Sequence, residues 1–365
     1  MTGLSTARLT IDLAALVANW RAMAALSSRA ETSAVVKADA YGIGVGPVVK
    51  ALADAGCRTF FVATHAEGAA VRGIAANAVI YVLDGLLPGT ADAFARHDLR
   101  PVLGSPGEIA EWTAWRSAGG PTGSAVQIDT GMNRQGLSAE EAAALAADAD
   151  ALAALAPDLI MSHLACGDDP ASPMTKRQLD TFVQLSALFP KVSRSLANSA
   201  GTMRGEAYQF DLTRPGIALY GARAANDHAA LTPVATAEVP VLRVREASAG
   251  ETVGYGATET LKRPSRLAVL GGGYADGYLR AAGSSDERPG ASVFIRGKRA
   301  PLVGRVSMDL MVADVSDVPG VERGDAAQLF GPNVPVDDVA DAAGTIGYEL
   351  LTSLGKRYVR SYVGA

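Results

Sequence analysis

The stretch SAVVKADAYGIG, Ser33–Gly44, decides the fold of this chain because an apolar run in it leads directly to a lysine. Residues 33–36 are small or β-branched, as in a buried strand, and Lys37 is followed by a tyrosine and two glycines. A lysine inside a protein is costly unless it is paired or chemically used. In a parallel barrel, reactive side chains lie at the carboxyl ends of the strands. Lys37 is therefore expected to end a strand at such a mouth.

Seven more short apolar runs follow, and most are separated by helix-like segments. They cover residues 59–63, 78–83, 99–103, 124–129, 158–164, 192–198 and 211–216. Residues 12–26 carry apolar side chains at helical spacing, and Ser138 with Glu141 forms a capping box. Eight β/α units predict a closed (β/α)8 barrel over residues 12–230, with a doubly wound open sheet as the alternative.

The pattern changes after residue 230. The runs become short and β-branched, and Gly and Pro interrupt them, as in SRLAVLGGG (265–273) and DAAQLFG (325–331). Residues 231–365, together with 1–11, are predicted to form a second, mostly β domain. The helix-like segment TIGYELLTSLG (345–355) is expected to close the chain.

Composition narrows the function. The 365-residue chain has a net charge of −5 and no long Lys/Arg run, which argues against nucleic acid or an anionic membrane as a partner. No apolar run is long enough to span a bilayer, and the N-terminus lacks the pattern of a signal peptide. Cys57 and Cys166 are isolated, so we expect a cytoplasmic protein with neither a disulfide framework nor a metal site.

Polar residues end four of the predicted strands, namely Lys37, His163, Asn198 with Ser199, and Arg214. Taken singly, Lys37 reads as a lysine reaching solvent, His163 as a core histidine and Arg214 as a turn residue. Taken together, they converge on one barrel mouth. The glycines after Lys37 and Arg214 allow backbone N–H groups to approach a phosphate. A lysine beside a phosphate site favours an imine-forming cofactor, pyridoxal phosphate.

The chain resembles the alanine racemase family over nearly its whole length. The resemblance rests on AVVKADAYGIG, DTGMNRQG, SHLACGDD, ANSAG, RPGIALYG, VGYG, GYADGYLR, GRVSMD and TIGYEL, in the family's order. It implies a pyridoxal-phosphate enzyme with an N-terminal barrel and a C-terminal β domain. Its activity would be the interconversion of L- and D-alanine, for peptidoglycan precursors or alanine catabolism.

The resemblance also implies a role for each matching residue. Lys37 would bind the cofactor as a Schiff base and act as one catalytic base, and Tyr255 of the partner subunit in a homodimer would be the other. The phosphate set would be Tyr41, Ser199, Gly216, Ile217 and Tyr348; His163 would pack on the pyridine ring, with Asn198 also at the cofactor. Arg134 and Met308 would bind the substrate carboxylate. Tyr274, Asp168, Arg280 and Arg305 would line the channel that admits substrate.

Arg214 would donate to the pyridine nitrogen. Because the pKa of an arginine exceeds ~12, that nitrogen should stay unprotonated, which limits side reactions such as transamination. Amino-acid decarboxylases with the same two domains place a carboxylate there instead. Arg214 therefore argues against a decarboxylase.

Two positions depart from the family pattern. Gln127 stands where many relatives have a lysine that carries a carbamate, and Ser307 stands where relatives often have a cysteine. Without the carbamate, the guanidinium of Arg134 would be oriented either by a chloride ion or by the amide oxygen of Gln127 alone. Two other functions remain open: a broad-specificity or serine racemase of the same fold, and a pyridoxal-phosphate carrier protein, which would be a single barrel without Tyr255.

Overall fold

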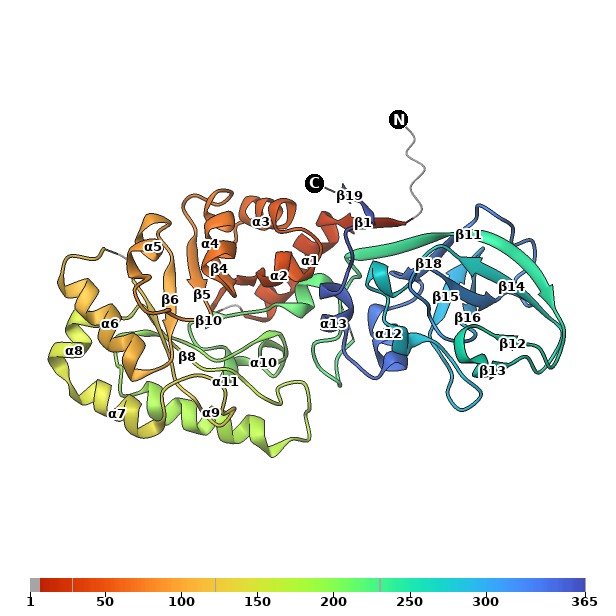
Figure 1. Cartoon of the computed structure of the whole chain (residues 1–365). Coiled ribbons are helices and arrows are strands. Elements are labelled where there is room, and N and C mark those ends of the chain that lie inside the picture. The colour runs from red at the N-terminus through yellow and green to blue at the C-terminus, as the bar shows by residue number, and fades with distance from the viewer. Residues whose placement is uncertain (1–6, 28, 122, 230, 365) are drawn as a thin grey trace.

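The N-terminal part of the chain is a barrel of parallel strands surrounded by helices (Figure 1). The computed structural model describes residues 7–27, 29–121, 123–229 and 231–364. Seven strands pair in sequence order in one parallel sheet. They are β3 (Ala34–Val35), β4 (Thr59–Val62), β5 (Val79–Val82), β6 (Arg100–Leu103), β7 (Ala125–Gln127), β8 (Leu159–Met161) and β9 (Ser193–Ser195).

The eighth strand closes the barrel. β10 (Leu212–Thr213) pairs in parallel with β2 (Glu31–Thr32), and the Val35 N–H donates to the carbonyl of Pro215 at 3.0 Å. On the other side, the Arg214 N–H donates to the carbonyl of Ala197 at 2.9 Å, which joins β10 to the end of β9. The predicted (β/α)8 barrel is therefore confirmed, and the open sheet is wrong.

Helices cover the outside of the barrel, and their ends follow the capping residues in the sequence. Asp12 caps the first helix by accepting the N–H of Ala15, and the predicted Ser138–Glu141 capping box is confirmed. The helices of this domain are α1 (Leu13–Leu26), α2 (Lys37–Tyr41), α3 (Val45–Asp54), α4 (His65–Arg72), α5 (Ala91–Arg96), α6 (Pro106–Ser117), α7 (Ala139–Ala147), α8 (Ala149–Leu155), α9 (Pro173–Ser186), α10 (Ser199–Met203), α11 (Glu206–Gln209) and the 3₁₀ turn η1 (Ile217–Tyr220).

The second part of the chain is mostly β and lies beside the barrel (Figure 1). Its largest sheet runs in the order β16-β15-β18-β11-β1-β19, and β14 joins it by pairing with both β11 and β17. The strands are β1 (Arg8–Asp12), β11 (Ala235–Ala247), β14 (Ser265–Leu270), β15 (Ser292–Ile295), β16 (Lys298–Pro301), β17 (Met311–Asp314), β18 (Ala326–Phe330) and β19 (Val359–Val363). A separate hairpin holds β12 (Thr252–Val253) and β13 (Glu259–Thr260), and two helices, α12 (Val336–Ala343) and α13 (Gly347–Thr352), follow β18.

The end of the chain differs from the sequence expectation. The predicted last helix is present as α13, but the chain does not close there, because β19 follows and pairs in parallel with β1. The residues of β19, VRSYV, alternate between exposed and half-buried positions at the edge of the sheet, so they lack the apolar run that marks a buried strand. β1 lies between β11 and β19, whereas residues 1–6 of the predicted N-terminal segment lie outside the described residues.

Across the part of the chain that the structure describes, no helix combines the length and apolar character needed to cross a bilayer.

Candidate active site

The ends of the barrel ladder place the polar residues of the mouth. The last ladder bonds are donated by Val36 to the carbonyl of Phe61 at 2.9 Å and by Ser162 to the carbonyl of Ser195 at 3.1 Å. Lys37 and His163 are the next residues along the chain. Lys37 was expected to be the last residue of its strand, but β3 ends at Val35 and Lys37 begins α2. The shift arises because the backbone turns sharply at this point.

The turn after Lys37 is left-handed. Ala38, Asp39, Ala40 and Tyr41 have φ values of 53°, 54°, 54° and 54°. This conformation costs an L-residue roughly 1–2 kcal/mol because its Cβ approaches the next carbonyl oxygen. Two carboxylates support the turn: Glu67 accepts the Ala38 N–H at 2.7 Å, and Asp39 accepts the Val45 N–H at 2.7 Å. The backbone therefore holds Lys37 at the mouth and directs Tyr41 into the barrel.

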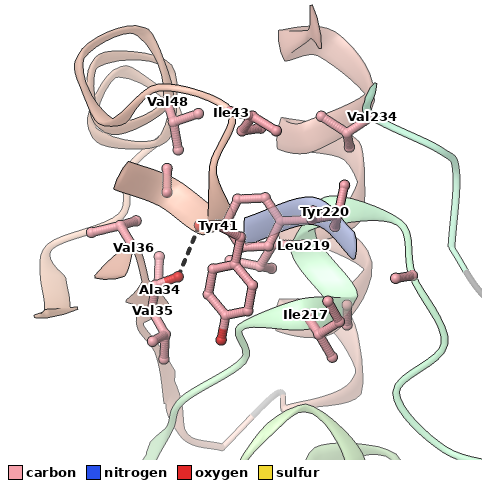
Figure 2. Packing of buried hydrophobic residues seen from close by; sticks show 14 of the residues in the cluster. Ala34, Val35, Val36, Tyr41, Ile43, Val48, Ile217, Leu219, Tyr220 and Val234 are labelled. Carbon is pink, nitrogen blue, oxygen red and sulfur yellow. Dashed lines mark hydrogen bonds between the residues drawn. The ribbon is translucent and has the colours of Figure 1, made fainter. Parts of the chain in front are cut away.

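Tyr41 forms one wall of a cradle with two other segments. Its ring stacks on Tyr220 at 4.4 Å between centroids, and Figure 2 shows both rings within the packed apolar cluster. A Cβ at Gly216 would lie 2.3 Å from the Tyr41 hydroxyl, so only glycine allows this approach. Ser199 Oγ accepts the N–H of Gly216 at 2.8 Å. The hydroxyls of Tyr41 and Ser199 thus lie close to the main chain of Gly216.

One cavity brings together most of the residues that the sequence placed at the cofactor. Its lining contains Lys37, Tyr41, His163, Asn198, Ser199, Arg214, Gly216, Ile217 and Tyr348. Three further lining residues, Val35, Phe61 and Leu83, were missed. They lie in or directly after the buried runs of β3, β4 and β5, so the inward-facing positions at the ends of those runs were the available signal.

The electrostatics of the cavity favour a neutral lysine and a neutral imidazole. Burial lowers the pKa of Lys37, the nearby guanidinium of Arg134 lowers it further, and Asp84 and Glu67 partly oppose this shift. Burial also lowers the pKa of His163 to about 3, with smaller contributions from Arg214, Arg134 and Lys37. His163 is therefore uncharged at neutral pH, and a larger fraction of Lys37 is in the neutral, nucleophilic form than of an exposed lysine.

Arg214 is a buried cation with 4% of its surface exposed. Its guanidinium donates to Ser195 Oγ and to the carbonyls of Ser162 and Leu196, all of them neutral acceptors. Burial lowers the pKa of Arg214 to about 9, which still leaves it protonated at pH 7. Among the described residues, Arg214 has no carboxylate partner and no carboxylate lines the cavity. This cavity is therefore suited to an electron-rich or anionic ligand.

Arg134 lies at a second, adjoining cavity. Met132, Arg134, Asp168 and Arg223 line it, and three residues line both cavities, His163, Asn198 and Tyr348. The amide of Gln127 donates to the carbonyl of Gln135 at 3.0 Å, and no hydrogen bond joins Gln127 to Arg134 within the described ranges. The fold thus places Arg134 and Asp168 beside the lysine cavity.

Five predicted site residues lie away from both cavities of the same chain. Tyr255, Tyr274, Arg280, Arg305 and Met308 all belong to the β domain and are exposed, with 73% for Tyr255 and 53% for Met308. Tyr255 is in the turn η2 (Tyr255–Ala257) between β12 and β13. A Cβ at Gly256 would lie 2.8 Å from Arg305, and the Tyr274 N–H donates to the carbonyl of Ser307. We call the surface of Tyr255, Tyr274, Arg305 and Met308 the β-domain patch.

The comparisons with known proteins agree with this architecture. Residues 11–224 match the family described as "Alanine racemase, N-terminal domain", and residues 234–362 match "Alanine racemase, C-terminal domain". A biosynthetic alanine racemase of Agrobacterium fabrum is 49% identical, covering 98% of this chain and 94% of the relative. A catabolic alanine racemase of the same organism is 42% identical, covering 99% of this chain and 93% of that relative.

A solved structure is similar along the whole chain. It is the alanine racemase of Bartonella henselae with covalently bound pyridoxal phosphate, at 38% identity and a TM-score of 0.92, covering 98% of this chain and 100% of that one. The two matched domains span nearly all of the sequence, and their boundary falls where the barrel gives way to the β domain. The chain belongs to the alanine racemase family.

Proposed function

We propose that this chain is an alanine racemase that interconverts L- and D-alanine with pyridoxal phosphate held at the barrel mouth. One observation carries the proposal: a single cavity holds a lysine of lowered pKa beside a buried cation, with no carboxylate among the described lining residues. Amino-acid racemisation needs a proton to leave one face of the α-carbon and another to return on the opposite face.

The residues of the cavity fit the cofactor. Gly216 leaves room where a side chain would meet Tyr41, and Ser199 already binds a main-chain N–H there. Tyr41, Ser199, Gly216, Ile217 and Tyr348 would hold the phosphate, with His163 against the ring. Bound covalently to Lys37, pyridoxal phosphate would stabilise negative charge on the α-carbon of alanine.

Lys37 and Arg214 would have different roles at opposite ends of the pyridoxal-phosphate ring. The lowered pKa of Lys37 increases the neutral fraction of its amine near pH 7, so it can accept a proton from the α-carbon. Arg214 keeps its proton, because its pKa, lowered by burial to about 9, is still above neutral pH, and it would donate a hydrogen bond to the pyridine nitrogen without transferring the proton. This arrangement favours return of the proton to the α-carbon over side reactions such as transamination.

The second base would come from another copy of the chain. Tyr255 lies on the β-domain patch and does not line the cavity that holds Lys37 of its own chain, and a homodimer would place it at the partner's barrel mouth. Met308, Arg305 and Tyr274 lie on the same patch, and Arg280 belongs to the same domain. Met308 would join Arg134 at the substrate carboxylate. The other three, with Asp168, would line the access channel.

Arg134 would need a partner to fix its guanidinium. The Gln127 amide donates to the carbonyl of Gln135, and a neutral amide brings no charge to Arg134, so a chloride ion is the partner we favour. An increase in activity with chloride, and none with bicarbonate, supports this assignment. Dependence on bicarbonate would contradict it.

Exchange of the α-proton tests the activity directly. Protein loaded with pyridoxal phosphate is incubated in deuterium oxide with each enantiomer of alanine. We expect deuterium to enter from both enantiomers, together with formation of the opposite one. Lys37→Ala should lower both rates by at least the ~10²–10⁴-fold that one proton-transfer group contributes. Lys50→Ala is the control, because Lys50 pairs with Asp54 on the surface.

The same assay separates the alternatives. Cofactor binding without exchange would indicate a carrier protein instead. Faster exchange with serine than with alanine would indicate a serine racemase, and comparable rates with alanine, serine, lysine and arginine would indicate broad specificity. We place the enzyme in the cytoplasm, supported by two cysteines that form no disulfide. The enzyme would supply D-alanine for peptidoglycan synthesis, or it would take part in alanine catabolism.

A further inference from the structure

Gln178 is a polar side chain on the outer helix α9 that is completely buried, with 0% of its surface exposed. Its amide nitrogen donates to the carbonyl of His163 at 2.8 Å and to Thr130 Oγ1 at 3.1 Å. Its amide oxygen accepts the N–H of Ala165 at 2.8 Å. A carbonyl only accepts and an N–H only donates, so His163 and Ala165 fix the orientation of the amide.

These contacts replace a missing strand. The barrel ladder of β8 ends with the bond from Ser162 to Ser195, and within the described residues the carbonyl of His163 and the N–H of Ala165 bond to the Gln178 side chain instead of a strand. A buried main-chain group without a partner is costly. Gln178 supplies one acceptor and one donor to the loop that carries His163. An apolar side chain of similar volume would fill the space but leave both groups unpaired.

The network continues to the centre of the cavity. Thr130 Oγ1, which accepts from Gln178, lies 2.8 Å from Ser162 Oγ, and the carbonyl of Ser162 accepts from the guanidinium of Arg214. Thr130 also belongs to the loop that leads from β7 to Arg134. One side chain of the outer layer therefore touches the loops of His163 and Arg134, and reaches Arg214 through two residues.

We propose that Gln178 is a positioning residue that fixes His163 and Arg214 against the cofactor ring through the main chain of His163 and through Thr130. It touches neither the cofactor nor the substrate. The proposal rests on the proposed function for its consequence in catalysis, but the loop order that it predicts exists without cofactor.

Gln178→Met tests the proposal, with Gln209→Met as the matched control. Gln209 is also buried, and its amide donates to the carbonyls of Leu26 and Thr202, which do not line the cavity. Both variants lose two donated hydrogen bonds. In the cofactor-free protein, we expect hydrogen–deuterium exchange to rise in residues 129–136 and 162–169 for Gln178→Met, and to stay at the parent level there for Gln209→Met.

In the loaded enzyme, we expect Gln178→Met to shift the visible absorption band of the cofactor and to lower kcat about tenfold to a hundredfold, as misplacement near 1 Å does. Gln209→Met should keep the parent band and a kcat within about twofold of the parent value. Equal exchange, equal bands and equal kcat in the two variants would overturn the proposal, because Gln178 would then be a core residue only.

A second pair of variants covers the case in which Gln178→Met does not fold. Thr130→Val removes the link between Gln178 and Ser162, whereas Thr130→Ser keeps the hydroxyl. We expect the band shift and the kcat loss in Thr130→Val and their recovery in Thr130→Ser. No difference between the two would overturn the proposal. A parent protein that neither binds pyridoxal phosphate nor racemises alanine would overturn the proposed function, while the exchange measurement would still decide the role of Gln178.

Discussion

Gly216 shows how much one missing methyl group matters at this site. Its φ of −122° is negative, but with a ψ of −89° the backbone lies outside the main regions open to L-residues, so both conformation and space favour glycine. A Cβ would lie 2.3 Å from the Tyr41 hydroxyl and 3.1 Å from the ring carbon that bears it. Tyr41 cannot retreat easily because its ring stacks on Tyr220.

Gly216→Ala should therefore weaken cofactor binding. We expect the dissociation constant for pyridoxal phosphate, measured by titrating the cofactor-free protein, to rise at least about tenfold, which corresponds to ~1.4 kcal/mol. Gly46→Ala is the control, since nothing lies within 4 Å of its added Cβ. The double variant Tyr41→Phe with Gly216→Ala removes the hydroxyl that causes the clash. Because Tyr41 is itself a proposed phosphate ligand, the comparison is with Tyr41→Phe alone: adding Gly216→Ala to Tyr41→Phe should weaken binding less than Gly216→Ala does in the parent. Unchanged binding in Gly216→Ala would disprove the clash.

His163 makes the stability of the cofactor-free protein depend on pH. Its pKa falls from an ordinary 6.5 to about 3 on folding, so between these values the unfolded chain binds a proton that the folded chain does not. This stabilising contribution is complete above pH 6.5 and is lost as the pH falls toward 3. His163→Asn has no such proton. We expect the difference in unfolding free energy between parent and variant to shrink by up to ~1.4 kcal/mol per pH unit below 6.5. Denaturant titrations from pH 8 to 4 measure it, and parallel curves would contradict the shift.

At the scale of elements, the barrel strands were predictable for a physical reason. Parallel strands are buried on both faces, so they read as continuous apolar runs such as TFFV in β4 and VIYV in β5. β19 has no such run because it lies at a sheet edge, and its pairing with β1 joins residues about 350 positions apart in the chain. No local pattern can reveal that partnership.

The residues of the candidate site can likewise be divided into those that the sequence predicts and those that it does not. Lys37, His163 and Arg214 were predictable because unusual chemistry follows directly after an apolar run. Gln178 was not, since its partners are mainly main-chain atoms of another loop, and a glutamine on a helix normally faces water. The left-handed turn at Ala38–Tyr41 was also not predictable, because alanine and tyrosine rarely adopt it.

The capping box of α7 gives a test at the same scale. Ser138 Oγ accepts the Glu141 N–H at 3.2 Å, and Glu141 accepts the Ser138 N–H at 2.8 Å. Ser138→Ala should lower the free energy of unfolding by about 1 kcal/mol and leave cofactor binding unchanged, because α7 lies outside both cavities. Ser117→Ala is the control, because Ser117 is the last residue of α6 and not an N-cap. It should change the free energy of unfolding by less than about 0.5 kcal/mol. Equal losses in both variants would show that the cap contributes nothing.

At the scale of the whole molecule, the division of the site between domains predicts shared active sites. Lys37 lies in the barrel and Tyr255 on the β-domain patch, so two chains related by a two-fold axis would each complete the other's cavity. Lys37→Ala and Tyr255→Ala proteins should each be inactive. In a mixed dimer, one site then carries both changes and the other carries neither.

Mixing the two inactive proteins measures this arrangement. After subunit exchange, about half of the dimers should be mixed, and about a quarter of the parent activity should return if pairing is random and the sites are independent. Subunit exchange is followed separately by mass spectrometry of tagged and untagged chains, because a mixture of Lys37→Ala with parent protein keeps half of the parent activity whether or not the subunits exchange. No recovery despite proven exchange would mean that Tyr255 acts within its own chain.

The turn of α2 has a consequence for the chirality of the chain itself. Ala38, Asp39 and Ala40 combine φ of 53–54° with ψ of 48–56°, which is the mirror image of an ordinary right-handed helix and the natural backbone of a D-amino acid. Ala38 is exposed, so inverting its α-carbon only exchanges a methyl group and a hydrogen at the surface. A semisynthetic chain with D-alanine at this one position should relax roughly 1–2 kcal/mol of steric conflict. The residue best suited to follow Lys37 is thus one enantiomer of the amino acid that this family interconverts.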